Sequence, residues 1–271
     1  MTRCCVIGSP ISHSLSPVLH QAAYRELGLE WGYESFEVTE PELEPFLANL
    51  DDSWRGISLT MPLKRAAYRA VDQVVDDTAE YLEVINTIVF ERTTMIGYNT
   101  DVDGVVDALR EHDIEFVGEM IVVGGGATAA TALAAIRSMG GLKATVAVRD
   151  TSRAQFAADI GHRCGLDVTV VSLDHVGEIP AAPLLVSTIP ASAQGPYADA
   201  LASRAHVVFD VVYDPVRTPL IEAADRAGTT TIGGFDMLLH QAVRQVELMT
   251  ECASPPLEAM RTAGLAALGN R

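Results

Sequence analysis

Apolar positions along the chain fall into short β-branched runs and longer periodic segments, separated by glycine, proline and polar turns. The short runs predict strands, and apolar residues spaced three to four apart predict helices. In the N-terminal part the predicted strands are 3–7, 32–38, 55–60, 87–90 and 95–98, the last two as a hairpin. The predicted helices are 17–27 capped by Ser16, 39–50 with Thr39 and Glu42 as a capping box, one starting at Pro62, and 76–83.

The remainder of the chain alternates regularly between helices and strands. Helices are predicted at 102–112, 127–139, 152–163 and 219–228, and strands at 120–123, 143–148, 167–171, 184–187, 205–211 and 229–232. This alternation is typical of a parallel sheet with helices on both faces. Two more helices, 235–250 and 256–268, follow without a further strand.

These patterns predict an α/β protein with two α/β domains. The first domain would span residues 1–101 and the second, Rossmann-like, residues 102–235. Residues 236–271 would form C-terminal helices that pack back on the first domain. The two chain crossings between the domains would make a hinge around a cleft.

A strand that runs directly into Gly124, Gly125 and Gly126 is the most informative stretch. With Ala129 it fits the G-x-G-x-x-G/A fingerprint, and a predicted helix and second strand follow it. Gly124 would allow a tight turn, and Gly126 would let a pyrophosphate approach the backbone at the helix N-terminus. The stretch therefore predicts a dinucleotide-binding unit, although a glycine-rich turn can also be purely structural.

The residues after the strand at 143–148 bear on which dinucleotide binds. Arg149 and Arg153 could bracket the 2′-phosphate of NADP, each as a bidentate donor. Asp150 could instead bind the ribose 2′-hydroxyl of NAD. We favour NADP over NAD on the strength of the two arginines.

Composition narrows the possible partners. The chain has 271 residues, 19 of them basic and 36 acidic, for a net charge of −17. That charge disfavours nucleic acid and anionic membranes as partners. The cysteines show no metal-ligand or redox spacing, and no basic-then-apolar signal segment begins the sequence. We expect a cytoplasmic protein that binds small molecules and holds no metal.

Several polar residues are candidates for chemistry, but each also has an ordinary structural interpretation. Lys64 stands in the first turn of a predicted helix, where the helix dipole opposes a cation. A lysine so placed can serve proton transfer, or it can simply be a solvated lysine in an unfavourable position. Asp101 precedes another helix and could simply cap it. Loop, turn or surface roles equally fit Ser14, Ser16, Asn86, Tyr213 and Gln241.

Together, however, these residues lie in motifs that resemble the shikimate dehydrogenase family over nearly the whole chain. Apart from the glycine turn, the motifs are Gly8-Ser-Pro-Ile-Ser-His-Ser14-Leu-Ser16-Pro17-x-x-His20, Ser58-Leu-Thr60-Met-Pro62-x-Lys64, Asn86-Thr87, Asn99-Thr100-Asp101, Asp210-Val-Val-Tyr213-x-Pro-x-x-Thr218-Pro219-Leu220 and Gly233-Gly-x-x-Met237-Leu238-x-x-Gln241-Ala242. The sequence departs from the family pattern at Ser58, where asparagine is commoner, and at Glu83, Tyr98 and Val148.

The resemblance implies reversible NADP-dependent reduction of 3-dehydroshikimate to shikimate, within the shikimate pathway to chorismate and the aromatic amino acids. Lys64 and Asp101 would be the acid–base pair. Substrate contacts would come from Ser14, Ser16, Thr60, Lys64, Asn86, Asp101, Tyr213 and Gln241. Cofactor contacts are expected at Gly124, Gly125, Gly126, Ala127, Thr128, Arg149, Arg153, Thr188, Val211 and Gly234.

Two alternatives to this function stay open at the level of sequence. Asp150, together with a substrate pocket altered by the departures at Ser58, Glu83 and Tyr98, would suit an NAD-dependent quinate/shikimate dehydrogenase. A non-catalytic nucleotide or shikimate sensor could retain the same fold. A methylenetetrahydrofolate dehydrogenase would share the two-domain plan, but the paired serines and the Asn99-Thr100-Asp101 cap argue against it. The protein could be a monomer or a homodimer.

Overall fold

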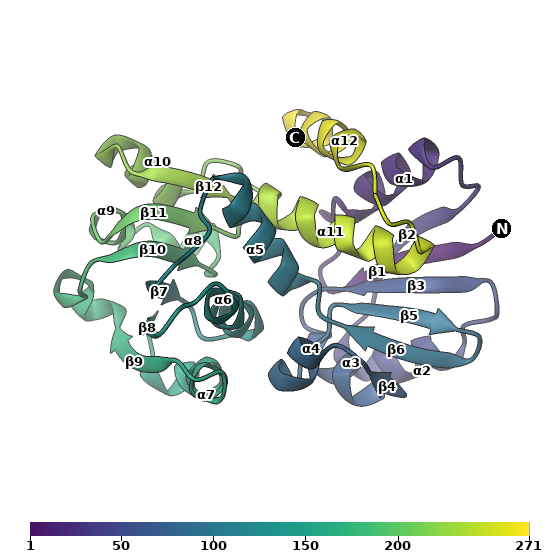
Figure 1. Ribbon diagram of the computed structural model, residues 1–271, viewed down its shortest axis with the longest axis horizontal. Helices are drawn as coiled ribbons and strands as arrows, with labels where there is room; N and C mark the ends of the chain where they lie inside the picture. Colours follow the sequence, from purple (N-terminus) through teal and green to yellow (C-terminus); the bar gives the residue numbers. More distant parts are fainter. Residues whose placement is uncertain (271) are drawn as a thin grey trace. The chain divides into compact units, whose positions relative to one another are not determined.

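The computed structural model describes residues 1–270 (Figure 1). The chain forms two compact units. Unit 1 contains Met1–Asp103 and the segment from Leu239 onward, and unit 2 is Gly104–Leu238. Both boundaries fall inside helices, namely α5 (Asp101–Glu111) and α11 (Gly234–Thr250). Each of these helices therefore contributes residues to both units.

Unit 1 is built on a six-stranded sheet in the order β2-β1-β3-β5-β6-β4. The strands are β1 (Arg3–Gly8), β2 (Gly32–Glu37), β3 (Trp54–Leu59), β4 (Gln73–Val74), β5 (Thr87–Glu91) and β6 (Thr94–Tyr98). β1 is parallel to β2 and β3, whereas β5 is antiparallel to β3 and β6. The sheet is thus mixed, and the predicted hairpin is confirmed as β5–β6.

Both faces of the unit 1 sheet are covered because apolar side chains alternate along β1. Cys5 and Ile7 belong to one buried cluster, and Cys4 and Val6 belong to another that also contains Met249 of α11. The helices are α1 (Ser16–Glu26), α2 (Leu43–Ala48), α3 (Lys64–Ala70), α4 (Asp77–Leu82) and α12 (Leu257–Gly269), with a 3₁₀ turn η1 (Glu40–Glu42). α12 packs beside α1 (Figure 1).

Unit 2 is a fully parallel sheet in the order β12-β11-β10-β7-β8-β9. Its strands are β7 (Glu119–Val123), β8 (Lys143–Val148), β9 (Asp167–Ser172), β10 (Ala182–Ser187), β11 (Ala205–Asp210) and β12 (Thr230–Gly233). Numbered from β7, this is the 3-2-1-4-5-6 order of a Rossmann fold, so the predicted fold class is confirmed.

Helices surround the unit 2 sheet, as alternation in the sequence predicts. They are α6 (Ala127–Ser138), α7 (Gln155–Arg163), α8 (Ala191–Gln194), α9 (Ala198–Ala202) and α10 (Pro219–Ala227), with 3₁₀ turns η2 (Thr151–Ala154) and η3 (Leu173–Glu178). Ile121 and Val123 of β7 are buried with apolar residues of α9 and α10. Within residues 1–270, no helix is long and apolar enough to cross a membrane.

The structure corrects two predicted helix starts and refines a third. α3 begins at Lys64 with Leu63 as its N-cap, so Pro62 precedes the helix. The backbone of Leu15 is already helical, so Leu15 is the N-cap of α1 and Ser16 lies inside the helix. The hydroxyl oxygen of Ser14 accepts the Ser16 N–H at 3.3 Å, so Ser14 fills the role predicted for Ser16. The capping box of Thr39 and Glu42 is present, but it starts the short turn η1 rather than a continuous helix. The sequence pattern also missed β4, η3, α8 and α9.

Candidate functional site

The candidate acid–base residues stand where three strands of unit 1 end or begin. Lys64 is the first residue of α3, shortly after β3, and Asp101 is the first residue of α5, shortly after β6. Asn86 directly precedes β5. Because Ser58 pairs with Thr87 and Thr87 pairs with Tyr98, the register of the sheet brings these strand ends to one edge.

Lys64 and Asp101 form a tight ion pair, with Lys64 Nζ 2.5 Å from Asp101 Oδ2. Their side chains are only 16% and 7% exposed. The other carboxylate oxygen, Oδ1, accepts a hydrogen bond of 2.9 Å from Asn86 Nδ2. Asn86 Nδ2 also lies 3.3 Å from Gln241 Oε1. Four of the predicted site residues therefore meet in one largely buried cluster.

A turn before α5 holds Asp101 in place. Asn99 Oδ1 accepts the Asp101 N–H at 3.0 Å, and Asn99 Nδ2 donates to the Val84 carbonyl at 3.0 Å. The Thr100 N–H donates to Asn86 Oδ1 at 2.8 Å. Since a backbone N–H can only donate, Oδ1 of Asn86 must be the acceptor and its amide nitrogen must face Asp101.

Three further predicted substrate residues lie in unit 1: Ser14 in the loop after β1, Ser16 at the start of α1, and Thr60 in the loop after β3. Ser14 is half-buried, Ser16 is buried, and Thr60 is half-buried. Two backbone hydrogen bonds tie the loops together, Ser9 N–H to the Met61 carbonyl at 3.0 Å and Thr60 N–H to the Ile7 carbonyl at 2.9 Å. Tyr213 lies in unit 2, in the loop after β11.

The glycine turn of unit 2 connects β7 to α6. Gly124 has a φ of +123°, and a Cβ there would lie 2.2 Å from Thr188 Oγ1. A Cβ on Gly125 would lie 2.4 Å from the Arg153 carbonyl oxygen. Gly126, the N-cap of α6, has extended backbone, and a Cβ there would meet nothing within 4 Å. Only Gly126 therefore borders open space, in front of the N–H groups that begin α6 at Ala127 and Thr128.

The neighbouring predicted cofactor residues also lie at the carboxyl ends of unit 2 strands. Thr188 follows β10, and both its N–H and its hydroxyl donate to the Val123 carbonyl at 2.9 Å. Val211 follows β11, and a Cβ on Gly234 would lie 2.1 Å from the Val211 carbonyl oxygen. Gly234 is therefore required by this close backbone approach.

After β8, Arg149 and Arg153 are exposed, whereas Asp150 forms hydrogen bonds with a neighbouring residue. Asp150 Oδ1 accepts from the Ser152 hydroxyl at 2.7 Å and from the Ser152 N–H at 3.0 Å, which caps η2. These hydrogen bonds lower the pKa of Asp150. The carboxylate thus already has partners, whereas the two guanidiniums face solvent at the end of β8.

Sequence reasoning missed a buried carboxylate network in unit 2. Asp210 Oδ2 accepts from Thr218 Oγ1 at 2.6 Å and from Gln194 Nε2 at 2.8 Å. Burial raises the pKa of Asp210, against the effect of these hydrogen bonds. The network fixes the loop between β11 and α10 that carries Tyr213. In the sequence, the network could have been inferred from the polar residues Asp210 and Thr218, which flank that loop.

Sequence reasoning also missed Gln245 and Tyr33 in unit 1. Gln245 Nε2 donates to Thr87 Oγ1 at 2.9 Å, beside Asn86, and Gln245 is only 1% exposed. It follows Gln241 by four residues, so both lie on the same face of α11. The spacing of Gln241 and Gln245 can be seen in the sequence. The hydrogen bond from Tyr33 to Ser58 cannot, because only the fold brings these two residues together.

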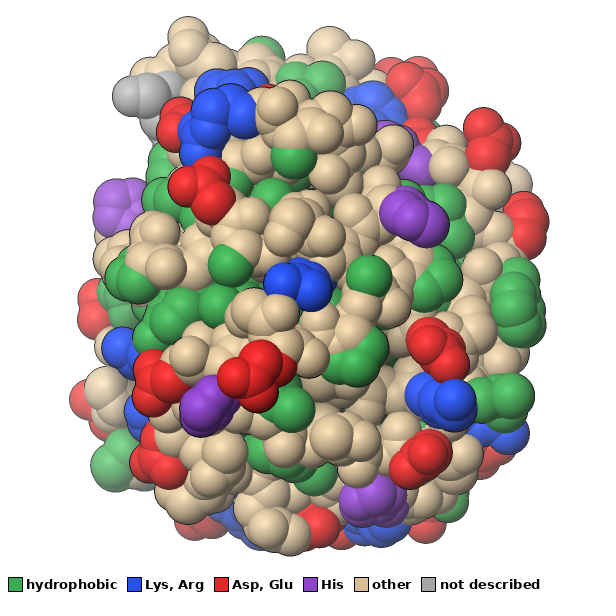
Figure 2. Space-filling model, turned by 90° about the vertical axis from the view of Figure 1, so that its left-hand side faces the viewer, with side chains coloured by type: hydrophobic (Ala, Val, Ile, Leu, Met, Phe, Trp, Pro, Cys, Tyr) green, Lys and Arg blue, Asp and Glu red, His purple; other side chains and the backbone are tan. Residues whose placement is uncertain are grey.

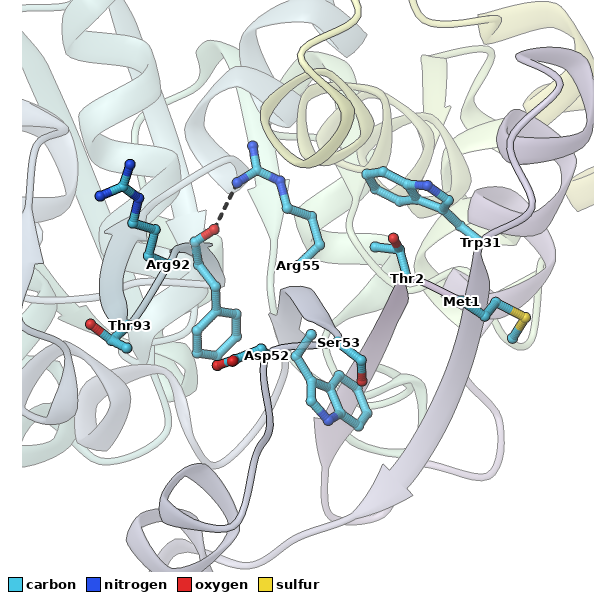
Figure 3. A pocket seen from close by; sticks show the side chains of 10 residues that line it. Met1, Thr2, Trp31, Asp52, Ser53, Arg55, Arg92 and Thr93 are labelled. Carbon is cyan, nitrogen blue, oxygen red and sulfur yellow. Dashed lines mark hydrogen bonds between the residues drawn. The ribbon is translucent and has the colours of Figure 1, made fainter.

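A separate cavity of about 580 Å³ lies elsewhere in unit 1 (Figure 3). Trp54 and Arg55, at the start of β3, line it together with Trp31 and Phe90. The Arg55 guanidinium donates to the carbonyls of Phe90 and Met249 at 2.7 and 2.8 Å. None of the predicted site residues lines this cavity, and the candidate site follows the opposite end of β3.

Neither the face shown in Figure 2 nor the metal-binding types of side chain in residues 1–270 indicate a further site. Acidic, basic and apolar side chains are interspersed over the face shown in Figure 2, without a broad basic patch on that face. Among residues 1–270, no three histidine, cysteine or acidic side chains are grouped to hold a metal ion.

The structure thus combines a Rossmann-ordered unit carrying a dinucleotide-type glycine turn with an α/β unit carrying a buried lysine–aspartate pair. These features define the class of two-domain nucleotide-binding α/β proteins. Family models agree: residues 6–88 match the shikimate dehydrogenase substrate binding domain, and residues 234–263 match the shikimate 5′-dehydrogenase C-terminal domain. The chain belongs to the shikimate dehydrogenase family.

Individual relatives match over nearly their full length. A shikimate dehydrogenase (NADP(+)) of Natronomonas pharaonis is 36% identical over 92% of this chain and 94% of its own. The crystal structure of Mycobacterium tuberculosis shikimate dehydrogenase has a TM-score of 0.89 and 39% identity over 98% of this chain and all of its own. A Thermus thermophilus shikimate 5-dehydrogenase in complex with NADP(H) and shikimate has a TM-score of 0.85 and 30% identity, covering 99% and 100%.

Proposed function

We propose that this protein is a shikimate dehydrogenase that interconverts 3-dehydroshikimate and shikimate with NADP. The observation that carries the proposal is the ion pair of Lys64 and Asp101, held by Asn86 in a largely buried cluster. Such a pair can move a proton at the substrate oxygen that changes between ketone and hydroxyl. The related enzymes named for this activity support the choice of substrate and cofactor.

The residues of unit 2 fit a dinucleotide. The open space at Gly126 leaves room for a pyrophosphate against the backbone, and the N-terminus of α6 offers free N–H donors there. NADPH, when bound, would supply the hydride for reduction, and NADP⁺ would accept it in the reverse oxidation. Arg149 and Arg153 would hold its 2′-phosphate, since Asp150 is engaged with Ser152. Ala127, Thr128, Thr188, Val211 and Gly234 would complete the contacts.

In unit 1, Lys64 would donate the proton to the carbonyl oxygen during reduction and accept it during oxidation. Asp101 would keep Lys64 oriented, and Asn86 would keep Asp101 oriented through its 2.9 Å hydrogen bond. Ser14 and Ser16 would bind the substrate carboxylate through their hydroxyls. Thr60 and Gln241 would bind substrate hydroxyls, and Tyr213 remains a predicted substrate contact from unit 2.

The cellular setting follows from this activity. The reaction would belong to the shikimate pathway, which leads to chorismate and the aromatic amino acids. All four cysteines are free thiols, which suits a reducing cytoplasm. We expect a monomer or a homodimer that needs no metal.

The decisive experiment is a matrix of steady-state assays on purified protein, with shikimate and quinate each paired with NADP and NAD. The proposal expects the highest kcat/KM for shikimate with NADP. A higher kcat/KM for quinate with NAD would identify an NAD-dependent quinate/shikimate dehydrogenase instead. No turnover with any pair would point to a nucleotide or shikimate sensor.

A further inference from the structure

A chain of buried hydrogen bonds leads away from the lysine–aspartate pair through unit 1. At its far end, Tyr33 Oη donates to Ser58 Oγ at 2.6 Å, and Ser58 Oγ donates to Gln245 Oε1 at 2.7 Å. The three residues are 2%, 3% and 1% exposed, so water has little access to these groups. Tyr33, Ser58 and Gln245 come from β2, β3 and α11, which the fold brings together at one point.

The same chain continues to the reacting groups. Gln245 Nε2 donates to Thr87 Oγ1 at 2.9 Å, and Thr87 Oγ1 donates to Asn86 Oδ1 at 2.9 Å. Asn86 Nδ2 then donates to Asp101 Oδ1. Every donor in this path points from Tyr33 towards Asp101, so each hydroxyl and amide between these two residues is both a donor and an acceptor.

Backbone groups fix the Asn86 end of the path, whereas the Gln245 amide has only one long contact with the backbone. The Thr100 N–H donates to Asn86 Oδ1, and the Asn86 carbonyl oxygen lies 3.4 Å from Gln245 Nε2. If the Gln245 amide were reversed, its oxygen would face that carbonyl oxygen. The Thr87 hydroxyl would then donate to Gln245 and no longer to Asn86. The orientation of the Gln245 amide therefore controls whether Asn86 Oδ1 accepts a hydrogen bond from Thr87 in addition to the one from Thr100.

We infer that Ser58 is a positioning residue, which sets the amide orientation of Gln245 and, through Thr87 and Asn86, the orientation of Asp101. Its hydroxyl is the donor that Gln245 Oε1 requires, and an alanine there would leave a buried acceptor without a partner. The inference rests on the proposed function, because it takes Asp101 to be part of the proton-transferring pair. Tyr33 supports Ser58 by occupying its acceptor position.

A matched control is available on the same side of the sheet. Tyr24 is 1% exposed and belongs to the same buried cluster as Tyr33, but its hydroxyl faces the sulfur of Met249 at 4.0 Å. Tyr24→Phe and Tyr33→Phe thus make the same chemical change at equally buried positions. Only the second removes a donor from the path to Asp101.

The test measures kcat and KM for shikimate in Ser58→Ala, Tyr33→Phe and Tyr24→Phe, each alone and combined with Asp101→Asn. Ser58→Ala should lower kcat about 3- to 10-fold, the effect of one hydrogen bond, with KM nearly unchanged. Tyr33→Phe should have a smaller effect and Tyr24→Phe almost none. In the Asp101→Asn background, Ser58→Ala should cost nothing further, because its effect passes through Asp101.

Two results would overturn the inference. One is a Ser58→Ala effect of full size in the Asp101→Asn background. The other is a loss of kcat in Tyr24→Phe as large as that in Tyr33→Phe, since this would reflect general loss of packing. If Ser58→Ala fails to fold, Tyr33→Phe decides the matter by the same two comparisons.

A second readout needs no turnover. In ¹⁵N NMR spectra, the side-chain amide signals of Gln245 and Asn86 should both shift in Ser58→Ala and remain in place in Tyr24→Phe. A wild-type protein without dehydrogenase activity would contradict the proposed function. Unchanged amide signals of Gln245 and Asn86 in Ser58→Ala would contradict the positioning path alone.

Discussion

Asp101 has each of its carboxylate oxygens held by a different residue, Oδ2 by Lys64 at 2.5 Å and Oδ1 by Asn86 at 2.9 Å. An ammonium that contacts a single carboxylate oxygen keeps further donor positions for a substrate oxygen. The carboxylate cannot rotate without breaking one of its two hydrogen bonds. This arrangement presents Lys64 in one orientation, as a positioned proton donor requires.

Removing Lys64 should abolish most of the catalytic rate. Lys64→Ala is expected to lower kcat by about 10²–10⁴-fold, the usual contribution of a positioned acid or base. Asp101→Asn should also lower kcat, and the double variant should lose far less than the product of the two effects, because the residues act as one unit. Steady-state kinetics of the three variants measures this.

The control for these variants is binding of NADP, which should be unchanged because the predicted nucleotide contacts belong to unit 2. Near-wild-type kcat in Lys64→Ala would end the proposed mechanism. Fully multiplicative losses in the double variant would show that Lys64 and Asp101 act independently.

Sequence patterns predict features that depend on residues close together in the chain, but not contacts between residues far apart in it. The βαβ unit around Gly124 and the capping box at Thr39 depend on neighbouring residues, and both are present. The contact of Lys64 with Asp101 joins positions 37 residues apart. Only the register of β3, β5 and β6 brings them together, so local patterns left Lys64 and Asp101 as a solvated lysine and a helix cap. The family resemblance supplied their pairing.

The prediction that Ser16 caps α1 was wrong because it relied on a local pattern alone. Serine before proline predicts a cap, but Leu15 already adopts helical backbone, and its carbonyl accepts the Leu19 N–H at 3.1 Å. The path from Tyr33 to Asn86 could not be predicted either, since it needs residues of β2, β3, β5 and α11 at hydrogen-bonding distance.

Two adjacent glycines should respond differently to alanine. At Gly126 a Cβ meets no atom within 4 Å, so Gly126→Ala should fold normally but occupy the space proposed for the pyrophosphate. At Gly125 a Cβ would lie 2.4 Å from the Arg153 carbonyl oxygen, so Gly125→Ala should lower the melting temperature. Thermal unfolding and NADP titration of both variants measure the two effects. Equal NADP affinity of Gly126→Ala and wild type would place the nucleotide elsewhere.

Cofactor preference should depend on Arg149. Arg149→Ala is expected to weaken NADP binding by about tenfold or more, the effect of losing hydrogen bonds to a charged group, and to leave NAD binding nearly unchanged. Asp150→Ala should not improve or impair NAD binding selectively, because Asp150 is engaged with Ser152. Titration with both dinucleotides tests this. Selective loss of NAD binding in Asp150→Ala would instead make Asp150 the residue that recognises the ribose.

Ser14, in the loop after β1, and Ser16, in the first turn of α1, should govern affinity for the substrate. An acidic protein repels an anionic substrate at long range, so local donors must bind the carboxylate. Ser14→Ala with Ser16→Ala is expected to raise KM for shikimate well over tenfold, since each hydrogen bond to a charged group contributes about 1.5–3 kcal/mol. Part of this effect could come from α1, because Ser14 caps it, so helix content by circular dichroism is the control. An unchanged KM would remove both residues from the substrate site.

Acid should destabilise unit 1 through His20, which is fully buried in α1 and stacks on Tyr33 with ring centroids 4.0 Å apart. Burial lowers the pKa of His20 from 6.5 to about 4, against the hydrogen bond of its Nδ1 to the Ser16 carbonyl. Below pH 6.5 the unfolded chain therefore binds a proton that the folded chain does not, and stability falls as the pH decreases towards 4. Linkage gives a loss of about 2 kcal/mol between pH 7 and pH 5 from this residue.

Urea unfolding of wild type and His20→Phe at pH 7 and pH 5 measures that loss. Phenylalanine keeps an aromatic ring for Tyr33 to stack on and removes the titrating group, so the variant should lose about 2 kcal/mol less than wild type over this pH interval. The comparison uses the change with pH rather than the absolute stability, because His20→Phe also removes the hydrogen bond to Ser16. Carboxylates elsewhere titrate in both proteins and cancel in the difference. Parallel pH dependence of the two proteins would show that His20 titrates normally in the folded state.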